Sequence, residues 1–238
     1  MTEVCIIMRN YNKTWDDFLH KFVSYKPRMC IDNYNENSEP ALVDVIYADS
    51  EECAREGFKN SSTCANFPEV IAWDKAIRYY IQNSDAEYIW FIEDDVFFMN
   101  EEVLKKIDEK YKTEDLLSAF HDINTTGDLY QNRWNHWINV EGKIGLPWAH
   151  SMICACRVSR RLLMEVGEYI KTHGTMFFVE AILNTLVLQK GMSIANPEEL
   201  VNIHWLTEWD RDNIDSSKLY HPFKKIEDHI YMRERYNI

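Results

Sequence analysis

Three consecutive carboxylates, Glu93, Asp94 and Asp95, stand between two apolar runs, Ile89–Ile92 and Val96–Phe98. Ionised carboxylates beside a buried strand destabilise a fold by several kcal/mol unless they are paired or bind a cation, and adjacent ones repel one another. A divalent cation removes both problems, and oxygen ligands with no cysteine nearby suit Mg²⁺ or Mn²⁺. A solvated acidic turn is the alternative, but the flanking apolar runs disfavour it. The triplet therefore predicts a Mg²⁺ or Mn²⁺ site.

The elements that must position this triplet are short strands that alternate with helices. Apolar runs predict strands at Val4–Met8, Arg28–Asp32, Leu42–Ala48, Glu87–Ile92, Leu116–His121, Ser151–Cys156 and Leu200–Trp205. Helical spacing and capping residues predict helices that begin at Thr14, Pro68, Asn100, Ser159 and Phe177. Residues 33–39 and 49–66 have the composition of loops, and residues 122–148 that of a long irregular excursion. This alternation predicts a single α/β domain with helices on both faces of its sheet.

The position of the triplet directly after a strand is informative, because open α/β sheets bind ligands beyond the carboxyl ends of their strands. In this setting Glu93-Asp94-Asp95 resembles the D-x-D motif of GT-A fold glycosyltransferases, with glutamate where the first aspartate is commoner. The resemblance implies one GT-A like domain over residues 1–238, with a Rossmann-like nucleotide-binding half and a mixed central sheet flanked by helices. It assigns a donor-nucleotide half to about residues 1–100, an acceptor half to about 101–205 and a polar, charged tail to 206–238.

The resemblance also implies roles for the triplet. Asp95 is the expected ligand of Mn²⁺ or Mg²⁺ on the donor diphosphate. Glu93 would bind the metal or the ribose, and Asp94 would bind the ribose or the donor sugar.

Other residues near the predicted strand ends are implicated by the same resemblance. Arg9 and Asn10 follow the first strand, where the family binds the nucleotide. Asp32 ends the second strand, where an acidic residue meets the base or ribose. Asp74 and Lys75 occupy a helix near the point where the family has donor-facing side chains.

Two later residues are candidates for chemistry. His204, at the end of the last predicted strand, resembles the late histidine that several of these enzymes place in the metal site; a satisfied structural histidine is the alternative. Glu180 lies among apolar neighbours, and desolvation raises a carboxyl pKa and makes the group a better proton acceptor. It resembles the base of inverting members of the family, unless it belongs to the polar face of a helix. Asp122 is the second candidate for a base.

The excursion at 122–148 carries Trp134, Trp137 and Trp148, whose faces could pack on sugars in an acceptor site or could pin the loop to the core.

The reaction implied is transfer of a sugar from a nucleotide-diphosphate donor, with UDP favoured because it is common in the fold, to the hydroxyl of a glycan or another acceptor. Glu180 as base favours inversion. A non-catalytic carbohydrate- or protein-binding module on the same fold is one alternative. A sugar-phosphate nucleotidyltransferase is another, but it needs a glycine-rich N-terminal loop, and none of the seven glycines precedes Gly57.

Composition limits the partners. The net charge of −13 repels phosphate backbones and disfavours nucleic acid, and a diphosphate ligand would need a cation or a local basic pocket. The six cysteines show no regular spacing, which predicts a reducing compartment with neither disulfides nor a zinc site. No signal peptide and no apolar run of roughly 18 residues occurs, so we expect a soluble, cytoplasmic protein.

Overall fold

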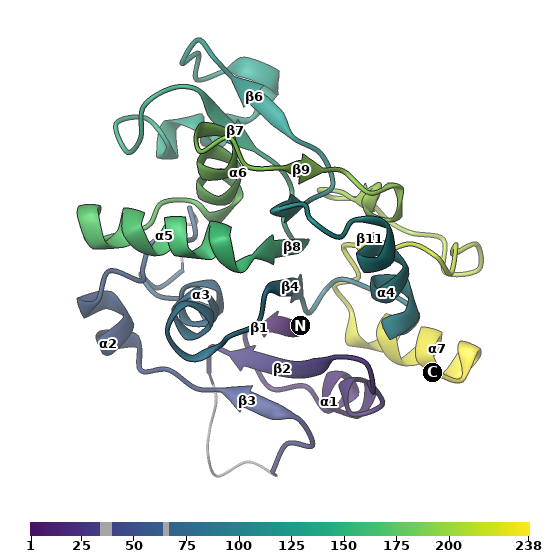
Figure 1. Ribbon diagram of the computed structural model, residues 1–238. Helices are drawn as coiled ribbons and strands as arrows, with labels where there is room; N and C mark the ends of the chain where they lie inside the picture. The colour runs from purple at the N-terminus through teal and green to yellow at the C-terminus, as the bar shows by residue number, and fades with distance from the viewer. Residues whose placement is uncertain (34–39, 64–66) are drawn as a thin grey trace.

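The structure, a computed structural model, describes residues 1–33, 40–63 and 67–238. Most of the segment expected as a loop at 33–39, together with Cys64, lies outside the described residues. Figure 1 shows the strands β3, β2, β1, β4 and β8 one above another in the central sheet, with helices to either side. The predicted α/β class with a mixed central sheet flanked by helices is confirmed.

The sheet has the strand order β3-β2-β1-β4-β8-β5-β9. Its first half is parallel and consists of β1 (Thr2–Met8), β2 (Lys26–Ile31), β3 (Asp44–Ile46) and β4 (Tyr88–Glu93). Its second half adds β8 (Ala155–Ser159), antiparallel to β4 and to β5 (Leu116–Leu117), and β9 (Ile194–Ala195), parallel to β5. The carboxyl ends of β1, β2 and β4 therefore meet at one edge of the sheet.

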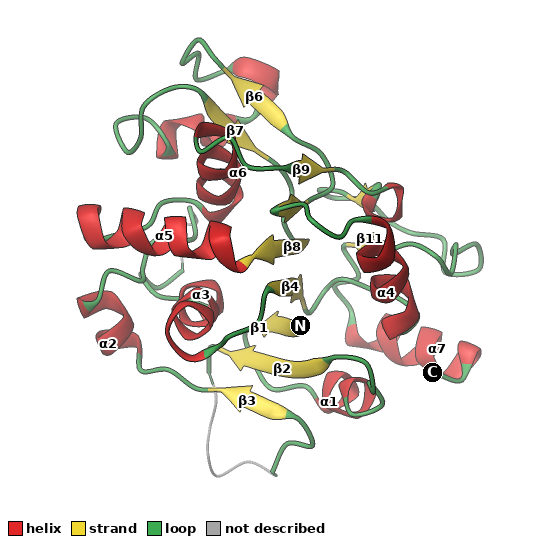
Figure 2. Ribbon diagram, in the orientation of Figure 1, coloured by secondary structure: helices red, strands yellow, loops and turns green. Residues whose placement is uncertain are grey.

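Helices cover both faces, as Figure 2 shows. One face carries α2 (Ser50–Arg55), α3 (Ala72–Asn83), α5 (Arg160–His173) and α6 (Val179–Gln189). The other carries α1 (Lys13–Leu19), α4 (Glu101–Lys110) and α7 (Ile226–Tyr236). Small two-stranded ladders join β6 (Asp122–Asn124) to β7 (Trp148–His150) and β10 (Asn202–Ile203) to β11 (Tyr220–His221). Short 3₁₀ turns lie at Gln131–Arg133, Asn135–Asn139 and Glu198–Leu200.

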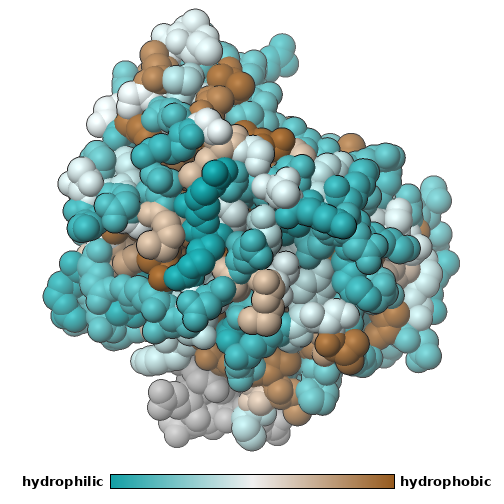
Figure 3. Space-filling view, in the orientation of Figure 1, coloured by the Kyte–Doolittle hydropathy of each residue, from teal (hydrophilic) through white to brown (hydrophobic). Residues whose placement is uncertain are grey.

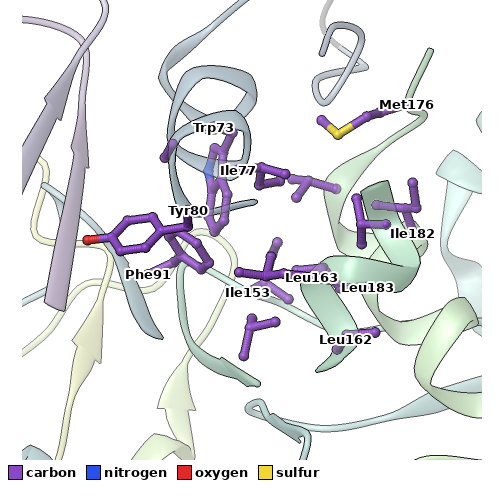
Figure 4. Packing of buried hydrophobic residues seen from close by; sticks show 14 of the residues in the cluster. Trp73, Ile77, Tyr80, Phe91, Ile153, Leu162, Leu163, Met176, Ile182 and Leu183 are labelled. Carbon is purple, nitrogen blue, oxygen red and sulfur yellow. The ribbon is translucent and has the colours of Figure 1, made fainter. Parts of the chain in front are cut away.

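The apolar runs of the strands divide between two cores, one on each face of the sheet. Along β1, Cys5 and Ile7 enter the first core, whereas Val4, Ile6 and Met8 enter the second. A strand buried on both faces must be apolar throughout, which is why the run shows no polar alternation. Figure 4 shows the first core, where side chains of α3 and β4 meet those of α5 and α6. On the face shown in Figure 3, hydrophilic residues cover most of the surface and hydrophobic ones form scattered patches.

Several predicted element boundaries were wrong. Residues 49–66 were expected as a loop, but Asp49 accepts from the Glu52 amide at 2.8 Å and caps α2. Helix α3 begins at Ala72 instead of Pro68, because the Asp74 carboxylate accepts from the Ile71 amide at 2.8 Å and fixes the start there.

Of the predicted strand Ser151–Cys156, residues 151–154 form the connection between β7 and β8, and only Ala155 and Cys156 lie in a strand, at the start of β8. The predicted strand Leu116–His121 shortens to the two residues of β5. Ser159 does cap α5, accepting from the Leu162 amide at 3.1 Å. The five described cysteines are free and buried. Within the described part of the chain, no helix is long and apolar enough to cross a membrane.

The largest correction concerns residues 206–238, which were expected to form a polar tail. Leu219, Tyr220, Phe223 and Met232 are buried in the second core, and α7 packs there. The segment is also hydrogen-bonded to the region after β4, because the Phe97 and Tyr220 amides each donate to the other residue's carbonyl, at 2.8 and 2.9 Å. The C-terminal segment is therefore part of the fold.

We predict that Met232→Ala lowers the free energy of unfolding by about 2–5 kcal/mol, because it leaves a cavity in the second core. Met164→Ala is the control, since Met164 is 42% exposed on α5, and its effect should stay within about 0.5 kcal/mol. Urea denaturation measures both. Equal effects of the two substitutions would contradict the burial of the C-terminal segment.

Candidate functional site

The parallel strands bring the predicted residues to one edge of the sheet. Backbone hydrogen bonds continue past the strand ends, from the Asp32 amide to the Met8 carbonyl and from the Asp94 amide to the Ile7 carbonyl, both 3.0 Å long. They fix the residues that follow β2 and β4 against the end of β1.

A cavity of about 340 Å³ opens at this edge, and six of the predicted residues line it: Arg9, Asp32, Glu93, Asp94, Asp95 and Glu180. A neighbouring cavity of about 430 Å³ shares Arg9, Asp32 and Phe67 with the first and extends to Lys75 and the start of α2. The Arg9 guanidinium lies 5.9 Å from the centre of the Phe67 ring. The two cavities therefore adjoin along one polar and aromatic wall.

The acidic triplet is held by indole groups. The Trp73 indole donates to Glu93 Oε1 at 2.8 Å, and the Trp15 indole donates to the Asp94 carbonyl at 2.9 Å. Burial, followed by the charge of Asp95, raises the pKa of Glu93. Burial and the charges of both neighbours raise the pKa of Asp94 to about 7. The neighbouring side chains therefore do not balance the negative charge of the three carboxylates.

His221 faces this charge, although it was not predicted. Its Nδ1 donates to the His204 carbonyl at 2.6 Å, because a carbonyl oxygen can only accept. In the neutral ring this leaves the lone pair on Nε2, which lies 3.3 Å from Asp95 Oδ1. That carboxylate oxygen is buried and has no hydrogen-bond donor among the described residues. Burial alone would lower the pKa of His221, but contact with Asp95 and the charges of Asp95 and Glu93 raise it.

The pair formed by Asp95 and His221 fits a divalent cation. Two lone pairs 3.3 Å apart repel unless a proton or a cation lies between them. A carboxylate oxygen and an imidazole nitrogen are ligands that Mn²⁺ and, less readily, Mg²⁺ accept. A hydrogen bond from the second ring nitrogen to a carbonyl is the usual way in which proteins orient a metal-binding histidine. The residues present therefore fit the metal that the resemblance implies.

The structure brings His221, and not the predicted His204, into contact with the triplet. The His204 side chain is exposed, and its ring lies 5.7 Å from the Trp209 ring. Its role in the site is limited to the backbone carbonyl that orients His221. A signal for His221 was present in the sequence, since it lies in the apolar stretch Leu219–Phe223 within an otherwise polar segment.

Asp74 and Lys75 lie behind the first cavity and do not line it. Asp74 is fully buried and accepts from the Ser61 amide at 3.1 Å, the Ser61 hydroxyl at 2.7 Å and the Ile71 amide. Lys75 Nζ donates to the Asp32 carbonyl at 3.0 Å and lies 3.5 Å from Asp32 Oδ1. The two residues therefore act by holding the Ser61 loop and Asp32 in place. Asn10 accepts from the Asn33 amide group at 3.1 Å.

Glu180 lies in the first turn of α6 and reaches the same cavity as the triplet. Burial and the charge of Glu93 raise its pKa to about 8, and a hydrogen bond with Trp134 opposes the rise. Asp122, the second candidate for a base, is not among the residues that line this cavity; its carboxylate lies 3.5 Å from His150 Nε2.

The tryptophans of the 122–148 segment are committed to packing. Trp137 and Trp148 are buried. Trp134 stacks on His150 at 3.9 Å and on Phe178 at 5.8 Å between ring centres. Their contacts hold the loop against β7 and α6, so the expectation that their faces pack on a sugar is not supported.

We predict that His221→Ala weakens Mn²⁺ binding by about tenfold or more, because it removes a proposed ligand. His204→Ala should leave binding unchanged, since only its backbone carbonyl takes part. Electron paramagnetic resonance of free Mn²⁺ during titration measures both. Equal losses in the two variants would contradict the assignment of His221.

A second prediction concerns pH. Folded protein keeps the Glu180 proton to about pH 8, whereas the unfolded chain releases it near the ordinary value of 4.5. Between these values the unfolded state binds fewer protons, so this group makes metal-free protein less stable as pH rises. The urea midpoint of Glu180→Gln should therefore match that of wild type near pH 4 and exceed it at pH 8. A difference that does not grow with pH would contradict the burial of this carboxyl.

No protein-family model matches the sequence, and no curated protein matches it. Among solved structures, the chain is similar to galactosyltransferase LgtC in complex with donor and acceptor sugar analogues, at 12% identity over 82% of this chain and 73% of that one, with a TM-score of 0.47. An active-site mutant of LgtC gives 11% identity over 93% and 87%, with a TM-score of 0.49. Apo mouse xyloside xylosyltransferase 1 gives 11% identity over 93% and 97%, with a TM-score of 0.42. At this similarity, the activity of the chain has to be inferred from its own residues.

Proposed function

We propose that the protein is a metal-dependent glycosyltransferase that moves a sugar from a nucleotide-diphosphate donor, with UDP favoured, to an acceptor hydroxyl. The observation that carries this proposal is the contact of His221 with Asp95, because Asp95 lines the same cavity as Arg9, Asp32 and Glu180. The reaction needs two ligands for a metal ion, a cavity large enough for a nucleotide, and a carboxyl group whose raised pKa makes it a better proton acceptor.

The charge balance of the cavity supports a cation-bound diphosphate. Among the described residues that line it, Arg9 alone is cationic, against the carboxyl groups of Asp32, Glu93, Asp94, Asp95 and Glu180. A diphosphate would be repelled from this surface in the absence of a metal. When bound, Mn²⁺ or Mg²⁺ would stabilise the charge that develops on the leaving diphosphate. Asp95 and His221 would hold it, and Arg9 would add the second positive charge.

The nucleoside would occupy the neighbouring cavity of about 430 Å³. Asp32 Oδ1 is a buried acceptor without a hydrogen-bond donor in the described part of the chain. A ribose hydroxyl or a base N–H would satisfy it. Lys75, which also lines this cavity, fixes the position of Asp32, and the exposed ring of Phe67 offers a face for the base.

Glu180 is the proposed base. The acceptor hydroxyl would give its proton to the Glu180 carboxylate while its oxygen bonds to the anomeric carbon and the bond to the diphosphate breaks, which inverts that carbon. With a pKa of about 8, much of Glu180 is protonated at neutral pH in metal-free protein. Because the charge of Glu93 contributes to this rise, a cation at the triplet would lower the pKa and favour the basic form.

A nucleotidyltransferase is the weaker alternative. The connection from β1 to α1, where such enzymes cradle a triphosphate in a glycine-rich loop, runs through Arg9–Asn12 and has no glycine. A non-catalytic binding module differs from the proposal only in turnover, so turnover decides between the two.

We predict that Glu180→Gln lowers sugar transfer by about 10²–10⁴-fold, because it removes the proton acceptor. Metal-dependent nucleotide binding should be unchanged. Turnover is measured as nucleoside diphosphate release from a panel of UDP- and GDP-sugars, with and without Mn²⁺. Glu168→Gln, at an exposed position on α5, is the matched control and should retain activity.

Full activity in Glu180→Gln would exclude this base. Nucleotide binding without turnover of any donor by wild type would favour the binding module.

A further inference from the structure

A thiol lies beside the candidate metal ligands, contrary to the expectation of an oxygen site with no cysteine nearby. One ligand atom each of Glu93, Cys154 and His221 lies within 4.8 Å of the other two. The prediction that the cysteines form no zinc site rested on spacing along the chain. Cys154 is distant from the triplet in sequence and becomes its neighbour only because the segment leading into β8 lies beside the end of β4.

Backbone contacts fix all three residues. The Glu93 amide donates to the Cys154 carbonyl at 2.7 Å, which sets these two residues side by side across the sheet. The Phe223 amide donates to the Asp95 carbonyl at 2.6 Å and ties the chain just after His221 to the triplet. Glu93 and Cys154 both line the 340 Å³ cavity, so an ion can reach them. Backbone hydrogen bonds therefore hold Glu93, Cys154 and the segment of His221 close together, whatever side-chain conformations they adopt.

The chemistry of this donor set differs from that of Asp95 with His221. A thiolate, an imidazole nitrogen and a carboxylate oxygen are the ligands that Zn²⁺ binds, and three protein ligands leave its fourth position open. Thiolate disfavours Mg²⁺ and Mn²⁺ and selects softer ions. Binding would release the Cys154 proton to solvent and form the metal–sulfur bond, with no change in oxidation state.

We propose that Glu93, Cys154 and His221 form a second binding mode of this centre, which takes Zn²⁺ or Cd²⁺. Because His221 belongs to both sets, Zn²⁺ in this mode excludes Mn²⁺ or Mg²⁺ held by Asp95 and His221. Zn²⁺ would then inhibit the enzyme in competition with the activating metal. Only this last consequence rests on the proposed glycosyltransferase function; the binding mode does not.

The test uses Co²⁺ as a spectroscopic substitute for Zn²⁺ in nucleotide-free protein. Wild type should show a thiolate-to-cobalt charge-transfer band in the near ultraviolet that Zn²⁺ abolishes. Cys154→Ser should lose this band and bind Zn²⁺ at least tenfold more weakly. Cys156→Ser is the matched control, because Cys156 is also buried two residues along the chain but packs in the first core, and it should retain both.

A second experiment measures Mn²⁺ binding and its displacement by Zn²⁺. Normal Mn²⁺ binding by Cys154→Ser would show that this variant is folded. Cys154→Ser should bind Mn²⁺ as wild type does, but at least tenfold more Zn²⁺ should be needed to displace it. A wild type without the band, a band that survives in Cys154→Ser, or equal displacement of Mn²⁺ in both proteins would overturn the proposal. Since no sugar donor is used, failure of the glycosyltransferase assay leaves these outcomes unaffected.

Discussion

Glu93, Asp94 and Asp95 repel one another at the end of a strand that is buried on both faces, and this repulsion shapes the rest of the site. Desolvation and mutual charge raise the pKa values of Glu93 and Asp94, so the triplet favours protons or a cation. Uncharged side chains at these three positions would suit the fold better. The excess charge is therefore the feature that the proposed metal ion would balance.

The chain surrounds this charge with contacts from distant segments. Trp15 on α1 and Trp73 on α3 fix the backbone and one carboxylate, and His221 arrives on the C-terminal segment. That segment is held by apolar burial and by hydrogen bonds to the residues after β4. The contacts that bury this segment also place His221 beside Asp95, so its packing and the proposed metal ligand depend on each other.

The sequence alone predicted those features that depend on residues close together in the chain. Apolar runs located most strands of the central sheet, and the triplet after β4 pointed to the sheet edge where the cavity lies, since both follow from residues close together in the chain. His221 and Cys154 were missed because each reaches the triplet through sheet pairing across a long sequence separation. Asp74 was predicted to face the donor, but it caps its own helix. The sequence around a helical carboxylate does not distinguish these two roles. The tryptophans of 122–148 were ambiguous for a similar reason, as only packing shows which ring faces are free.

Calorimetric titration of UDP into the protein, with Mn²⁺ and with a chelator, tests the central claim most directly. Binding should require Mn²⁺, should disappear in Asp95→Ala and should persist in Asp212→Ala, whose carboxylate is exposed and remote in sequence. That result would place a diphosphate on a metal at the triplet. UDP binding of equal affinity in chelator, or no binding of UDP or GDP under either condition, would contradict the account.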